Sequence, residues 1–80
     1  MARRVLVEVQ GDRDAALVLA RAWAKYGFVV DEAYGAVSME EGSVMIRGAL
    51  RDGAAEAALK AQAQVLGVWD DASIAPASLV

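Results

Sequence analysis

Hydrophobic and polar positions alternate along residues 4–10, where Val5, Val7 and Val9 share one side of the chain. A period of two, built on β-branched residues, predicts a half-buried β-strand. Residues 43–50 alternate in the same way and predict a second strand of this kind. The inward positions of this second strand are Val44, Ile46, Gly48 and Leu50.

A helical spacing replaces the alternation over residues 13–26. Asp12 stands where an N-cap is needed, and Gly27 fits a left-handed helix end. A second helix is predicted over residues 54–66, with Asp52 as its cap and Gly67 as its end. The apolar stripe of the first helix comprises Ala16, Leu19, Ala20, Trp23 and Ala24, and that of the second Ala54, Ala58, Ala61 and Val65.

Two further extended segments complete the pattern. Residues 28–39 read as a strand in which Gly35 indicates a bulge or a close backbone approach. The residues Glu40-Glu41-Gly42 then form a hairpin loop. Residues 68–74 predict the last strand, which Pro76 ends because proline cannot donate a hydrogen bond to a ladder.

The order of these elements is strand, helix, strand, strand, helix, strand. This order predicts an α+β fold, a ferredoxin-like βαββαβ sandwich with a four-stranded antiparallel sheet and two helices on one face. With 80 residues, the chain is expected to form one domain over residues 1–80, with a tail from about residue 73.

The composition argues against several classes of function. The net charge is −3 and the eight basic residues are scattered, so we expect no nucleic-acid partner. No apolar run reaches eighteen residues, and therefore no membrane partner is expected either. The chain has no Cys and no His, which removes thiolate metal sites and histidine acid–base chemistry. We therefore expect no metal, no cofactor and no enzymatic activity.

The candidate binding groups lie near the end of the chain. Asp70 and Asp71 sit where the last strand meets the tail, and such acids can cap the N-termini of a partner's helices. The alternative is that they only keep an edge strand soluble. Trp23 is expected in the core, whereas Trp69 with Tyr34 would form a small contact patch if exposed.

The second half of the chain resembles the subtilisin propeptide-like proteinase inhibitors. Val65, Val68 and Asp71 match a V-x-x-V-x-x-D motif that opens the last strand in that family, and a tail of small residues follows it. The resemblance implies that the sheet docks on a subtilisin-like serine protease. It also implies that the domain acts as an inhibitor, or as a propeptide that assists folding of the protease.

In that family the tail lies in the active-site cleft as an added strand, which is β-augmentation. The resemblance thus gives Asp70 and Asp71 the role of capping enzyme helices. The tail residues assigned to the cleft are Ile74, Ala75, Pro76, Ala77, Ser78, Leu79 and Val80.

Two alternatives stay open. Residues 7–14 resemble the first strand and ligand loop of ACT-type regulatory domains, which implies a small ligand near Gly11, Asp12 and Asp14. The other alternative is a homodimeric interaction domain that associates through its sheet or its edge strands.

Overall fold

The computed structural model describes residues 3–71 and confirms the α+β class. Two α-helices, one 3-10 helix and five strands follow one another along the chain. In order they are β1 (Arg3–Gln10), α1 (Arg13–Ala22), η1 (Trp23–Tyr26), β2 (Phe28–Val30), β3 (Ala36–Ser38), β4 (Ser43–Leu50), α2 (Gly53–Lys60) and β5 (Val65–Asp70).

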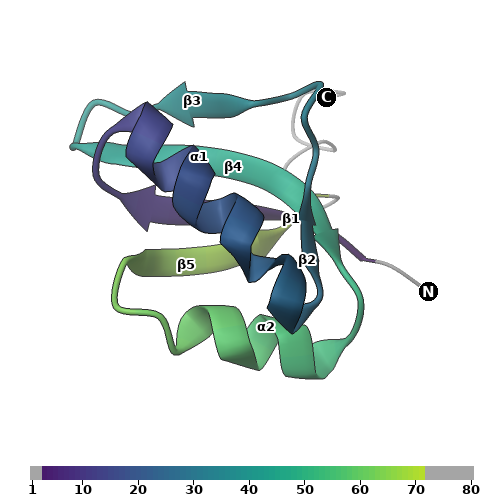
Figure 1. Cartoon of the computed structure of the whole chain (residues 1–80). Helices are drawn as coiled ribbons and strands as arrows, with labels where there is room; N and C mark the ends of the chain where they lie inside the picture. The colour runs from purple at the N-terminus through teal and green to yellow at the C-terminus, as the bar shows by residue number, and fades with distance from the viewer. Residues whose placement is uncertain (1–2, 72–80) are drawn as a thin grey trace, which may run out of the picture.

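The strands form one antiparallel sheet in the order β2-β4-β1-β5, and β3 also pairs with β4 (Figure 1). β2 and β3 occupy successive stretches of the same ladder, opposite residues 48–50 and 44–46 of β4. The expected count of four strands was therefore wrong, because the segment predicted as one strand over residues 28–39 is two.

A turn at Asp31 interrupts this strand. The backbone carbonyl of Asp31 accepts from the N–H groups of Tyr34 (3.2 Å) and Gly35 (3.1 Å), and its carboxylate accepts from Ala33 N–H at 3.1 Å. Gly35 has φ +72°, a left-handed conformation that glycine adopts without steric cost. The glycine that indicated a bulge inside a strand thus belongs to a turn between two strands.

The core lies between the helices and the inner face of the sheet. Val5, Val7 and Val9 have no exposed surface, as their alternation predicts. Trp23 is buried, as expected, and its ring makes a T-shaped contact with that of Phe28 at a centroid distance of 6.2 Å. The other buried apolar residues of the core are Ala16, Ala20, Val30, Val44, Ile46, Leu50, Ala55 and Leu59.

The second helix is shorter than expected and turned relative to the predicted stripe. Asp52 caps it through Ala55 N–H at 2.9 Å, but it ends at Lys60, and β5 already begins at Val65. Ala55 and Leu59 face the core, whereas Ala54 is exposed. Gly67, predicted to end the helix, lies inside β5.

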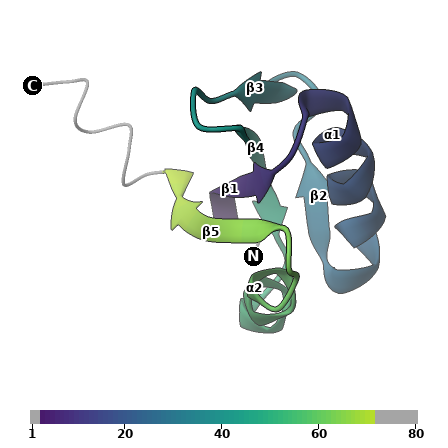
Figure 2. The ribbon, with the colours of Figure 1, turned by 90° about the vertical axis from the view of Figure 1, so that its left-hand side faces the viewer.

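The other face of the sheet carries no helix within residues 3–71. In the side view of Figure 2, α1 lies on one side of the β1–β4 pair, and no helix of residues 3–71 lies on the opposite side. This surface is called the open face below. Neither helix in residues 3–71 has the length and apolar character needed to cross a membrane.

Gly48 gives the first testable prediction. A Cβ at this inner position would lie 2.5 Å from the carbonyl oxygen of Val29 and 2.6 Å from Phe28 Cε1. Gly48→Ala is therefore expected to lower the free energy of unfolding by about 1–3 kcal/mol, the usual cost of overpacking a core. Urea denaturation followed by far-UV circular dichroism measures the loss.

The matched control is Gly53→Ala at the first residue of α2, where a Cβ would meet nothing within 4 Å. This variant is expected to be neutral, or stabilised by up to about 1 kcal/mol, because alanine restricts the unfolded chain. Equal stability of the two variants would contradict the tight approach of Phe28 to β4.

Candidate functional site

The open face is the strongest candidate site in the structure. Cross-strand pairs place three rows of side chains on it: Val29 with Ala49 and Arg4, Arg47 with Leu6 and Trp69, and Val37 with Met45 and Glu8. Within residues 3–71, no three carboxylates gather in a way that could hold a metal ion.

Apolar side chains are prominent on the open face. Val29 is 61% exposed and Trp69 is 42% exposed, although both are large and hydrophobic. Leu6 lies between Arg47 and Trp69 in the sheet and is only 6% exposed, so its neighbours cover it. An exposed tryptophan surrounded by apolar neighbours is typical of residues that dominate binding energy in protein interfaces.

Gly67 sets the position of Trp69. A Cβ at Gly67 would lie 2.4 Å from Cη2 and 2.7 Å from Cζ2 of the indole. The indole therefore lies over the bare backbone of its own strand, two residues back along the chain. The glycine expected to end a helix instead makes room for the largest side chain of the open face.

Arg47 connects three parts of this face. Its guanidinium lies 5.3 Å from the centroid of the Tyr34 ring, within the range of a cation–π interaction. Its Nε and Nη2 both donate to Oδ2 of Asp71, at 3.1 and 2.9 Å. Tyr34 and Asp71, which lie on either side of β4 in the sequence, are thus held to one cation.

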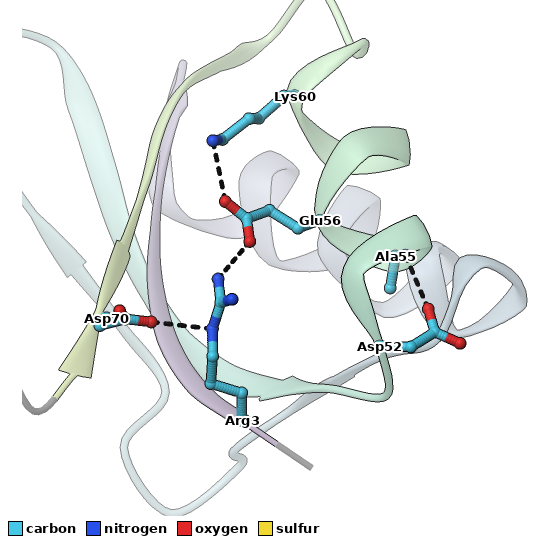
Figure 3. Close-up of polar contacts among 6 residues, drawn as sticks. All are labelled: Arg3, Asp52, Ala55, Glu56, Lys60 and Asp70. Carbon is cyan, nitrogen blue, oxygen red and sulfur yellow. Dashed lines mark hydrogen bonds and ion pairs between the residues drawn. The ribbon is translucent and has the colours of Figure 1, made fainter. Parts of the chain in front are cut away.

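Asp70 belongs to a second network at the neighbouring corner of the domain (Figure 3). Arg3 Nε lies 2.8 Å from Asp70 Oδ1, and Arg3 Nη2 also pairs with Glu56 of α2. Lys60 Nζ contacts the other oxygen of Glu56 at 2.8 Å. This network joins the first residue of β1, the last residue of β5 and the second helix.

The two acids predicted to meet a partner thus lie at the end of β5, with both carboxylates held in ion pairs inside the domain. Their role as caps for a partner's helices stays a prediction. The remaining predicted contact residues, 74–80, lie outside the residues that the structure describes.

The loop that the ACT-type alternative assigns to a ligand, residues 11–14, makes hydrogen bonds within the domain. Gly11 has φ +119°, and its N–H donates to the carbonyl of Gly42 at 3.1 Å. Asp12 Oδ1 accepts from Ala15 N–H at 2.7 Å and so caps α1, as the sequence predicted. Asp14 is exposed in the first turn of that helix. A ligand at this loop would compete with the cap for the same carboxylate.

Sequence reasoning overlooked Arg47. The signal was present, because alternation along residues 43–50 puts Arg47 on the face opposite Ile46. Its contacts with Tyr34 and Asp71, however, depend on the sheet order and on the turn at Asp31, which no local pattern specifies.

The chain matches no protein-family model, and no curated protein and no solved structure matches it significantly.

The Arg47–Asp71 pair gives the second prediction. Its side chains are 32% and 18% exposed, so water screens it less than it screens the Arg21–Glu32 pair, whose side chains are 51% and 58% exposed. A double-mutant cycle with Arg47→Met and Asp71→Asn is expected to give a coupling of about 1 kcal/mol. The matched cycle with Arg21→Met and Glu32→Gln should give a smaller coupling, because water screens this pair. Equal couplings, measured by urea denaturation, would contradict this assignment.

The Glu56 network gives the third prediction. Hydrogen bonds from Lys60 and then from Arg3 lower the pKa of Glu56. Because the charged form is favoured in the folded state, the stabilisation is full above the unfolded-state pKa of about 4.3. It is lost as the pH falls through the lower folded-state pKa. Glu56→Gln should therefore destabilise at pH 7, by less than about 1 kcal/mol, and have little effect near pH 2.

Urea midpoints of the wild type and the variant at both pH values measure this difference. Glu41→Gln is the control, because its carboxylate has no ion pair with any residue in 3–71. A constant gap between the Glu56→Gln variant and the wild type at both pH values would show that the charge of Glu56 is not responsible.

Proposed function

We propose that the domain is a non-enzymatic protein-binding module of the subtilisin-propeptide type. It acts as a proteinase inhibitor, or as a propeptide chaperone, of a subtilisin-like serine protease. In this proposal the open face supplies the docking area, and residues 74–80 lie in the active-site cleft as an added strand.

The observation that carries the proposal is the ion pair between Arg47 and Asp71. Asp71 is the last residue that the structure describes, and the pair holds it to the open face beside Trp69 and Tyr34. Asp71 thus lies on the face that carries the exposed aromatic residues. In the proposal, a partner that docks on this face also binds residues 74–80.

The proposal includes the finer fold assignment. Since β2 and β3 both pair with β4, we take them as two halves of one interrupted strand. The sheet order β2-β4-β1-β5 then corresponds to the ferredoxin-like arrangement, in which the first strand is central and both helices cover one face. Such an arrangement leaves the opposite face available for docking.

Removal of residues 73–80 tests the function. The truncated protein is expected to lose at least about 100-fold in inhibition of a subtilisin-type protease, because two lost main-chain hydrogen bonds of about 1.4 kcal/mol each account for that factor. Titration of the purified domain into a protease assay measures the loss. An unchanged thermal midpoint would show that the fold survives the truncation.

Two substitutions in the same titration separate docking from tail insertion. Trp69→Ala should weaken inhibition by about tenfold or more, as expected for an exposed aromatic anchor. Val18→Ala is the matched control, because Val18 is 66% exposed but lies on α1. Full inhibition by the truncated protein would reject tail insertion, and no inhibition by the intact domain would reject the proposed function.

A further inference from the structure

A hollow of about 220 Å³ lies on the open face, lined by residues of β1, β2 and β4 and by Asp31. Its floor is Ala49, which is paired across the sheet with Val29 on one side and Arg4 on the other. Arg47 and Asp31 complete the rim, and the N–H of Asp31 donates to the carbonyl of Arg47 at 2.8 Å. The hollow exists because alanine is shorter than the side chains around it.

The rim carries hydrogen-bond donors that no residue from 3 to 71 engages. Arg4 forms no ion pair with any residue from 3 to 71. The Nε and Nη2 groups of Arg47 donate to Asp71. Its Nη1 group donates to none of the residues in that range. The carboxylate of Asp31 accepts from Ala33 N–H within its own turn.

These features define the chemistry of the occupant. Two guanidinium groups favour a carboxylate, since charge-assisted hydrogen bonds from arginine are among the strongest in proteins. The methyl group of Ala49 and the side chain of Val29 favour a short apolar stem below that carboxylate. Asp31 at the rim repels any anion, and it repels a doubly charged phosphate more strongly than a singly charged carboxylate. The volume of about 220 Å³ is below the range of typical cofactor sites.

We propose that this hollow receives a glutamate side chain of the protein partner. The inference rests on the proposed function in one respect, namely that a protein docks on the open face. It adds the recognition chemistry: an acidic residue on the partner meets Arg4 and Arg47, while Trp69 and the tail bind elsewhere. Charge complementarity at this point sets the orientation of the partner on the sheet.

The first experiment needs no protease. Sodium butyrate, which carries a carboxylate on a three-carbon stem, is titrated into the ¹⁵N-labelled domain, with butyramide and with sodium chloride of equal ionic strength as controls. Butyrate should shift the amide signals of Val29, Asp31 and Ala49, with a Kd on the order of 10 mM as befits so small a ligand. Equal shifts with butyramide or with chloride, or tighter binding of inorganic phosphate, would overturn the carboxylate assignment.

A filled hollow gives the structural control. Ala49→Leu places a larger side chain in the hollow and should abolish the butyrate shifts. Ala63→Leu adds the same volume at an exposed position in the loop before β5 and should leave them unchanged. Butyrate shifts that persist in Ala49→Leu would place the carboxylate elsewhere and reject the site.

The second experiment tests the source of the carboxylate. Arg4→Gln should weaken inhibition of a protease that the wild type inhibits by about tenfold, and the difference should shrink at high salt. Wild-type strength in Arg4→Gln would overturn the proposal that the partner supplies the glutamate. A wild type that inhibits no subtilisin-type protease would reject the proposed function instead, and the butyrate titration would still decide on the hollow.

Discussion

The structure depends on the burial of one face of β1. Val5, Val7 and Val9 are completely buried against side chains from both helices, and β1 pairs along its length with β4 on one side and with β5 on the other. A domain of this size has a small core and little surplus stability, so the loss of this ladder of contacts is not compensated elsewhere. The same constraint makes Gly48 necessary, because the ring of Phe28 lies where a side chain would be.

Burial on one side decides what the other side presents. Successive strand residues point to opposite faces, so the inward valines direct Leu6 and Arg4 outward. In β4 and β5 the same parity turns Arg47 and Trp69 outward and places them beside Leu6. The binding face that we propose is therefore a direct consequence of the core pattern.

Ion pairs then arrange the edges of that face. Arg47 holds Asp71 and Tyr34, and Arg3 holds Asp70 to the Glu56–Lys60 pair of α2. Each pair contributes little to stability by itself, because most of these side chains are partly exposed to water. Their effect is geometric, since they fix where the chain arrives at the end of β5. Asp70 and Asp71, which the sequence predicted to meet a partner, are thus paired with arginines of β1 and β4.

The sequence by itself determined the α+β class, both helix caps, the left-handed end at Gly27 and the buried faces of β1 and β4, because each is specified by neighbouring residues. It did not determine where α2 ends, since residues 61–66 have ordinary helix propensity. Only the pairing of Val65 with Val9, beside a register shift in β1, draws Val65 and Leu66 into β5. The split of β2 from β3 comes from the local turn at Asp31, which the sequence pattern indicated only as a bulge or close approach at Gly35. The meeting of Arg47 with Asp71 required the tertiary structure. Contacts between segments far apart in sequence decide the end of α2 and the Arg47–Asp71 pair, and such contacts leave no periodic trace in the chain.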